Sequence, residues 1–466
     1  MRLGSEFMPA GLWPARGIRR RLIVVAVGVL GICGLPVTAL SQDTWYVDAD
    51  ATGPVHDGTD WCTAFQLMQD AIAVAVAGDT ILVAEGTYMP HASDSSQAFL
   101  LVPGITWRGG FAGCDSPLAE HNPAVYPTVL SGDLSQNDDV SSFPDGLTFV
   151  DNSDHVIQLA AGGAAATLEG FIISGGHAEN ELVGDAGGGV LVEGGHLVMR
   201  RCTLEWNHAG RGAAVHVSGG FLEVDGCTFL RNEAIRWGGA VDHFSCSSSI
   251  VNSVFLGNRT DGEGGAVHSD LSTVTATNTT MTMNTALNRG GGFFNYAGVE
   301  LRGTNNILWL NTSIDGQTEA AQIFNNKSNL NVVNHSCVSG WTGKWGGEGN
   351  HGEAQGFVGQ PSPGADMAWN GVDDDLGDLR LDAGSPCRNA GDNDADIDAA
   401  APGLQPIPDH DIRGAVRIAD GTVDMGAFEG ASAGVPAQGV WGGIITMLGI
   451  LALADVQFRR RHRRLE

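Results

Sequence analysis

The sequence predicts an all-β chain that winds into a right-handed parallel β-helix, and three observations carry this prediction. A pattern of the type GGAV recurs with its last residue at Val190, Val215, Val241, Val267 and Phe293, in steps of 25 or 26 residues. A second pattern ends in asparagine with nearly the same period, at Asn207, Asn232, Asn258, Asn284 and Asn311. Between these positions the chain has short alternating apolar stretches without helical periodicity.

A unit of about 26 residues with two or three short strands cannot bury its own apolar side. Stacked coil on coil at the spacing of neighbouring strands, about 4.8 Å, such units share one interior. The repeated asparagines then have a structural explanation, because stacked amides at turns form hydrogen bonds along the axis. The paired glycines mark turns that need a positive φ.

The composition limits the partners of this chain. The 466 residues include 53 Asp and Glu against 25 Lys and Arg, which gives a formal net charge of -28. With 43% hydrophobic and 17% charged residues the chain can bury a core, so it is not a disordered polyelectrolyte. The acidic surface argues against nucleic acid as a partner and suits an extracellular protein or a calcium binder.

The N-terminal residues have the order of a secretory signal peptide. Three arginines, Arg19 to Arg21, precede an apolar run from Leu22 to Leu35, and small residues follow up to Ser41. We therefore expect residues 1–41 to form a signal helix that is removed on export.

The mature chain is expected to contain a cap, a stack of coils, a closing segment and a tail. Residues 42–98 would form the N-terminal cap and first coils, because an open stack exposes strand edges. Residues 99–340 would form the β-helix and residues 341–430 its loop-rich final coils and closing module. The cap helix is predicted from apolar residues at helical spacing, namely Phe65, Met68, Ala71, Ile72 and Val76.

The last segment, residues 431–466, reads as a linker and a hydrophobic helix. Gly439 to Ala454 is apolar, and five arginines follow it. Sixteen apolar residues are marginal for a membrane span of about 20. The arginines would hold their end in the cytoplasm, so we expect transient anchoring in a membrane.

Several motifs resemble those of known secreted proteins. The FxxN and GGA[IV] pairs, as in Phe229 to Asn232 and Gly238 to Val241, resemble the repeats of polymorphic outer membrane proteins. The segments 45–53 and 77–90 look like the opening coil and capping helix of many secreted right-handed β-helix proteins, a resemblance that implies a pectate-lyase-like solenoid. The segments 382–392 and 423–429 resemble the closing module of surface proteins with a variable anchor.

The tail also carries a resemblance. Pro436, Trp441-Gly442, a short apolar span and the arginine cluster look like the IPTL-type sorting tails of Gram-negative surface proteins. This resemblance implies a secreted protein of the cell surface or outer membrane of a Gram-negative-type bacterium, with an anchor that is removed on export. Its role would then be adhesive or structural.

The outward residues next to the repeated valines form the best candidate site. If each valine points inward, the next residue points outward, and one period brings such residues side by side. Carboxylates with imidazoles perform acid-base chemistry or hold a metal, and aromatic rings stack on sugars. The candidate catalytic residues are His216, Asp242, His268 and Asp270, and the candidate ligand-binding residues are Phe244, Phe294 and Tyr296. A ladder without function remains the alternative.

Two functions follow from these observations. The first is a non-enzymatic surface protein that binds polysaccharide or components of the cell envelope. The second is a polysaccharide lyase or glycoside hydrolase that uses the outward His/Asp patch. Pectate-lyase-like enzymes hold Ca²⁺ with carboxylates and use a basic residue, but the lysines here, Lys327 and Lys344, lie outside the predicted columns.

A calcium site and three cysteine pairs are further predictions. Alternating carboxylates in a polar loop could supply oxygen ligands to Ca²⁺, namely Asp392, Asp394, Asp396 and Asp398, or form a solvated acidic loop. Cys202 and Cys227 occupy neighbouring coils and could form a disulfide or a ladder of reduced thiols. Proximity in sequence suggests the pairs Cys62 with Cys114 and Cys337 with Cys387.

Overall fold

The computed structural model describes most of the chain between the two termini. The described residues all belong to one compact unit and are 42–115, 120–179, 185–297, 300–326, 331–354, 356–369, 371, 373–395, 407–418 and 420–430. The predicted signal peptide and the hydrophobic tail lie outside them. Within these ranges, no helix has the length and apolar character needed to cross a bilayer.

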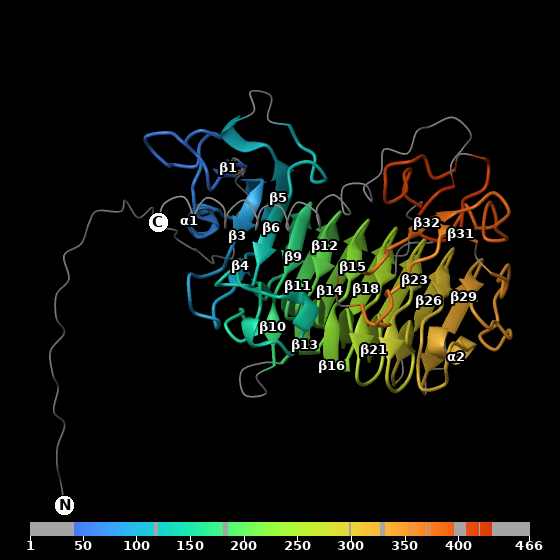
Figure 1. Cartoon of the computed structure of the whole chain (residues 1–466). Coiled ribbons are helices and arrows are strands. Elements are labelled where there is room, and N and C mark those ends of the chain that lie inside the picture. The colour runs from blue at the N-terminus through green and yellow to red at the C-terminus, as the bar shows by residue number, and fades with distance from the viewer. Residues whose placement is uncertain are drawn as a thin grey trace, which may run out of the picture. The chain divides into compact units, whose positions relative to one another are not determined.

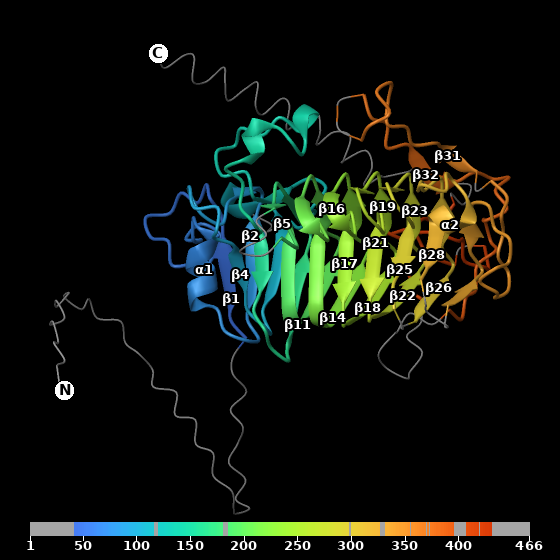
Figure 2. The ribbon, with the colours of Figure 1, turned by 90° about the horizontal axis from the view of Figure 1, so that it is seen from below.

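Parallel strands stack coil on coil along the chain, which makes the fold a right-handed parallel β-helix, as predicted (Figures 1 and 2). The repeated valines pair in register on successive coils, since Val190 pairs with Val215, Val215 with Val241, and Val241 with Val267. Phe293 continues this row. The period read from the sequence is therefore the length of one coil.

Three parallel sheets make up the faces of the stack. The largest sheet contains β1 (Thr44–Val47), β2 (Thr80–Ala84), β4 (Phe99–Leu101), β5 (Thr106–Phe111), β7 (Ile157–Leu159), β8 (Ala165–Glu169), β11 (Val190–Arg200), β14 (Val215–Asp225), β17 (Val241–Phe244), β18 (Ser247–Val251), β21 (Val267–Asp270), β22 (Thr273–Thr277), β25 (Phe293–Asn295), β26 (Leu301–Thr304), β28 (Ile323–Asn325) and β29 (Asn331–Asn334).

The second sheet contains β3 (Gly86–Tyr88), β6 (Thr128–Ser131), β9 (Phe171–Ser174), β12 (Thr203–Glu205), β15 (Thr228–Leu230), β19 (Val254–Leu256), β23 (Thr280–Thr282), β27 (Ile307–Trp309) and β30 (Cys337–Val338). The third sheet contains β10 (His177–Ala178), β13 (His208–Arg211), β16 (Glu233–Trp237), β20 (Arg259–Thr260) and β24 (Thr285–Ala286). The strands β31 (Phe357–Gly359) and β32 (Asp378–Leu381) pair antiparallel.

Short helices complete the described elements. α1 (Met68–Val74) buries Met68 and Ala71 at the first coil, as the helical spacing predicted. The side chain of Val76 follows the helix end and is exposed, so its predicted place in this cap is wrong. The remaining helices are α2 (Glu319–Gln322) and the 3-10 turns Gly113–Asp115, Val140–Ser142 and Leu147–Phe149.

The interior is apolar with one continuous amide ladder. Phe229 and Phe255 stack with ring centroids 4.4 Å apart. The Asn232 amide donates to Asn258 Oδ1 at 2.9 Å, and the Asn258 amide donates to Asn284 Oδ1 at 2.8 Å. The predicted structural role of these asparagines is confirmed, and the ladder ends on Gln322.

The cysteine pairs Cys62–Cys114 and Cys337–Cys387 are disulfides, as suggested by their proximity in sequence. Cys202 and Cys227 are buried free thiols, and the Cys202 backbone N–H donates to Cys227 Sγ at 3.4 Å. These two cysteines therefore form a reduced ladder.

From the coil of β8 onward, the chain turns from the largest sheet to the second sheet through one residue with a left-handed backbone. These corner residues are Gly170, Arg201, Gly226, Asn252, Asn278, Asn305 and His335, with φ between 44° and 76°. Residues of the closing module, defined as the described part of 382–430, hydrogen-bond to the later corners. The Asn252, Asn278 and Asn305 amides donate to the carbonyls of His410, Asp424 and Asp392.

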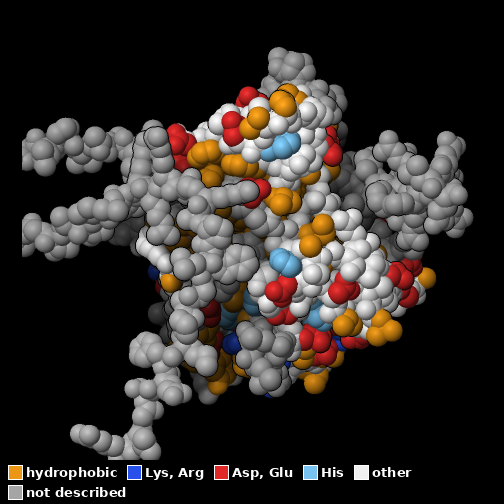
Figure 3. All heavy atoms as spheres, turned by 90° about the vertical axis from the view of Figure 1, so that its left-hand side faces the viewer, with side chains coloured by type: hydrophobic (Ala, Val, Ile, Leu, Met, Phe, Trp, Pro, Cys, Tyr) orange, Lys and Arg blue, Asp and Glu red, His pale blue; other side chains and the backbone are white. Residues whose placement is uncertain are grey.

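The end of the stack at which the coils begin shows more acidic than basic side chains (Figure 3). This agrees with the negative net charge of the chain.

Candidate functional site

The predicted His/Asp column exists and is held together by hydrogen bonds. Asp242 on β17 lies between His216 on β14 and His268 on β21, because these three residues pair in register on successive coils. Asp242 Oδ2 lies 2.9 Å from His216 Nδ1, and Asp242 Oδ1 lies 2.6 Å from His268 Nδ1. Burial alone would raise the pKa of Asp242, but these two hydrogen bonds hold it well below its usual range.

The expectation that this column faces solvent is wrong. The exposed fractions of His216, Asp242 and His268 are 4%, 2% and 5%. The turn that enters each coil folds back over the column, so Trp237 stacks on His268 with centroids 5.6 Å apart. A Cβ at Gly212 would lie 3.0 Å from Asp242 Cβ, which shows how closely this turn packs against Asp242. A polysaccharide cannot contact Asp242 in this arrangement.

The other members of the predicted patch have different environments. Phe294 is buried and stacks between His268 and Phe324, so its faces are not available to a sugar. Phe244 is 41% exposed, while Asp270 and Tyr296 are half-buried. Burial raises the pKa of Asp270. A catalytic or sugar-binding role of these residues stays a prediction.

The predicted calcium loop is described only in part. Asp396 and Asp398 lie outside the described residues. The Asp394 backbone N–H donates to the Asp392 carboxylate at 3.0 Å, and the Asp392 carbonyl accepts from Asn305. Calcium binding here stays a prediction, which thermal melting with and without Ca²⁺ would check.

A groove of about 620 Å³ crosses the corner between the largest and second sheets. Its floor comes from the corners of four coils, and its two walls come from the loop 122–124 and from residues 408–414 of the closing module. The closing module covers the corners from Asn252 onward, and the loop covers the first coils. The corners at Arg201 and Gly226 remain open between them, whereas Gly170 is buried next to Pro123 of the loop.

Charged side chains of both signs line this groove. Arg200, Asp409 and His410 are exposed, whereas Asp225 is half-buried. Burial raises the pKa of Asp225, although the positive charge of Arg200 opposes this shift. Arg201 forms an ion pair with Glu169, and Arg108 approaches the same carboxylate at 3.2 Å. The groove therefore offers fixed hydrogen-bond donors and acceptors in a concave site.

The sequence alone did not identify this groove. The arginine pair at 200–201 lies where two neighbouring coils have glycine, Gly170 and Gly226, at the corner. This contrast was the available signal. The wall formed by residues 408–414 has no sequence signal, because those residues lie more than 150 positions from the floor.

One group of side chains in the described ranges has ligand atoms close enough to share a metal ion. It consists of His177, Glu179 and His208, on or beside the third sheet. The sequence analysis did not single out these residues.

Comparison with protein-family models and with curated proteins found no match. Among solved structures, the chain is similar to pectate lyase Pel9A, with 12% identity, a TM-score of 0.37, and coverage of 84% of this chain and 98% of that chain. It is also similar to a rhamnogalacturonan lyase, with 13% identity, a TM-score of 0.32, and coverage of 68% and 90%. Similarities this distant carry no information on activity.

Proposed function

We propose that this protein is an exported β-helix protein of the cell surface that binds carbohydrate in the corner groove. The observation that carries the proposal is the groove itself, which is concave and lined by exposed hydrogen-bonding side chains such as Arg200, Asp409 and His410. Binding sites of this kind combine a shaped cavity with a few placed polar groups.

The spacing of the corners in the groove suits successive sugar units of a glycan segment. Its floor repeats once per coil, about every 4.8 Å, which is similar to the length of one sugar unit. A short glycan segment bound between the loop and the closing module would therefore meet one corner with each successive sugar. Hydroxyl groups of the glycan would bond to Asp409 and His410, and Arg200 would bind hydroxyl or carboxylate groups.

The surface location is supported by the sequence. The signal-peptide pattern of residues 1–41 and the sorting-tail resemblance of residues 431–466 are consistent with export and transient anchoring. Adhesion to glycans of another surface, or attachment of the protein to its own envelope, would both use the same groove.

Binding of the purified protein to a panel of neutral and acidic polysaccharides tests this function. Affinity electrophoresis identifies the ligand, and calorimetry measures its dissociation constant. We expect Arg200→Ala to weaken binding about tenfold, which corresponds to about 1.4 kcal/mol. Arg302→Ala is the matched control, because Arg302 lies on β26 outside the groove and pairs with Glu300 at 2.8 Å.

Two results would count against the proposal. The first is equal affinity in the native protein, Arg200→Ala and His410→Ala. The second is release of reducing or unsaturated sugar ends during the same incubations, which would favour the lyase or hydrolase alternative.

A further inference from the structure

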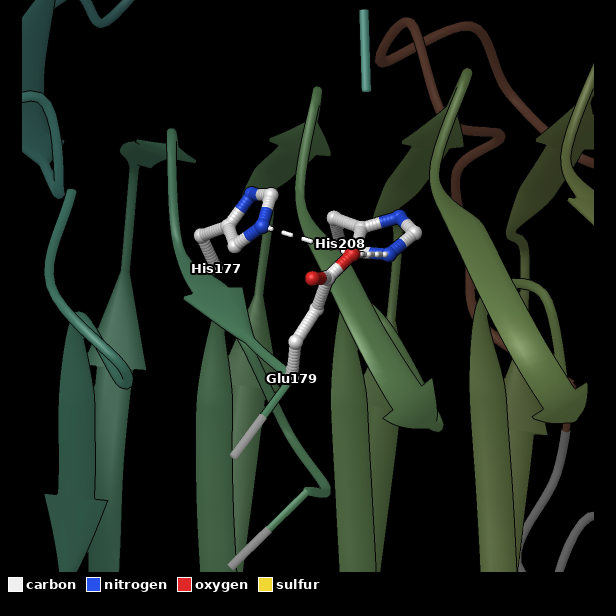
Figure 4. Close-up of side chains that lie close together, drawn as sticks. All are labelled: His177, Glu179 and His208. Atoms are coloured by element: carbon white, nitrogen blue, oxygen red, sulfur yellow. Dashed lines mark ion pairs between the residues drawn. The ribbon is translucent and has the colours of Figure 1, made fainter. Parts of the chain in front are cut away.

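We propose that His177, Glu179 and His208 form a binding site for a divalent transition metal, with zinc as its expected occupant. His177 on β10 and His208 on β13 pair in register on adjacent coils. Figure 4 shows the Glu179 carboxylate between the two imidazole rings. Glu179 Oε1 lies 2.7 Å from His208 Nε2 and 3.4 Å from His177 Nε2.

The two distances from Glu179 are close to those between neighbouring ligands of a metal site. Bonds of 2.0–2.1 Å in a tetrahedral zinc site place neighbouring ligand atoms roughly 3.3 Å apart. The Glu179–His177 distance is already near this value, and the Glu179–His208 distance would lengthen by roughly 0.6 Å. Glu179 can move this far because its side chain is 46% exposed, and all three ligand atoms lie within 4.8 Å of one another.

The rings are held in place by their surroundings. Phe149 stacks on His177 with ring centroids 6.4 Å apart. Phe143 and His208 form a T-shaped pair with ring centroids 6.2 Å apart. The side chain of His208 is 4% exposed and that of His177 is 16% exposed. Two imidazoles fixed by the backbone register and by aromatic packing lose little conformational entropy when they bind a metal.

The ligand types select the metal. Two imidazole nitrogens and one carboxylate oxygen suit zinc and neighbouring transition metals, whereas calcium and magnesium prefer oxygen ligands. Three protein ligands leave the fourth position to water or to an oxygen of another molecule. The exposed side of Glu179 places that position toward solvent.

Metal titration of the untagged full chain after chelation and dialysis tests this site. We expect one equivalent of Zn²⁺ per chain by elemental analysis, and the visible absorption bands of tetrahedral Co²⁺ when cobalt replaces zinc. The key variant is Glu179→Gln, because Glu179 is the most exposed of the three ligands and its loss leaves the core intact. We expect its affinity for zinc, measured by competition with a chromophoric chelator, to fall roughly 100-fold or more.

The control is Glu223→Gln. Glu223 Oε1 lies 2.9 Å from His196 Nε2, so this pair has the same chemistry without a second imidazole that joins it. Its removal should leave zinc binding unchanged. Zinc binding below a tenth of an equivalent in the native chain, or equal affinity in Glu179→Gln and the native chain, would overturn the proposal.

Discussion

Replacement of Asn258 by alanine is expected to lower the free energy of unfolding by about 3 to 6 kcal/mol. The Asn258 amide donates to Asn284 Oδ1 at 2.8 Å and to the Phe229 carbonyl at 2.9 Å. Asn258 Oδ1 accepts from the backbone N–H and the side-chain amide of Asn232, at 3.1 and 2.9 Å. The residue is fully buried, so water cannot replace these bonds.

Truncation removes one hydrogen bond from the Phe229 carbonyl and two from Asn232, whose side-chain amide keeps its bond to the Leu204 carbonyl at 2.9 Å. An unsatisfied buried group costs about 1–3 kcal/mol, and a ladder of polarised amides adds cooperativity. Asn284 keeps one bond, because its Oδ1 also accepts from the Asn258 backbone at 3.0 Å. The effect should therefore stay local to two coils, and the measurement is the midpoint of urea unfolding.

Asn288→Ala is the matched control. Asn288 is exposed on the same stack and donates to Glu263 Oε1 at 3.1 Å. A surface change of this kind usually alters stability by no more than about 0.5 kcal/mol. Equal, small effects of the two alanine variants would show that the asparagine ladder does not stabilise the coils.

The fold could be predicted from the sequence because stacking makes the period visible. Residues that occupy the same place on successive coils meet the same neighbours, so each place keeps one residue type, as at Val215, Val241 and Val267. The same logic placed Asp242 between His216 and His268. The rule that one period makes one coil therefore predicted which residues point into the interior. It also predicted which residues neighbour one another in the His/Asp column.

Burial of the column could not be predicted in this way. The alternation of a strand gives the direction of a side chain but does not tell what covers it. Trp237 belongs to the third sheet, and its ring reaches His268 only because the turn before β17 folds back. The column therefore points outward from the core and is still inaccessible.

The metal site was missed for a different reason. His177 and His208 are 31 residues apart, which is five more than the usual coil. If every coil is assumed to have the same length, the two histidines are assigned to different positions on their coils. The dipeptide His-Ala at both positions was the signal that could have aligned them.

Asp242→Ala is expected to destabilise the protein by about 3 to 5 kcal/mol, the usual cost of removing one partner from a buried charged pair. The carboxylate accepts hydrogen bonds from both His216 and His268, and its loss leaves two buried imidazoles without an acceptor. Asp270→Ala is the control, because Asp270 is half-buried and lies two residues after His268 on the same strand. It should lower the free energy of unfolding by less than about 1 kcal/mol. Thermal and urea unfolding measure both.

The pH dependence adds a second test of the same carboxylate. The folded pKa of Asp242 is depressed, so its contribution is present above the unfolded pKa, about 3.9, and is lost as the pH falls toward the folded value. Near neutral pH, the free energy of unfolding should therefore be higher for the native protein than for Asp242→Ala. This difference should shrink below about pH 4 as the carboxylate becomes protonated. A catalytic Asp242 without structural role would instead give variants with native stability at every pH, so unfolding curves distinguish a buried stabilising ladder from a catalytic site.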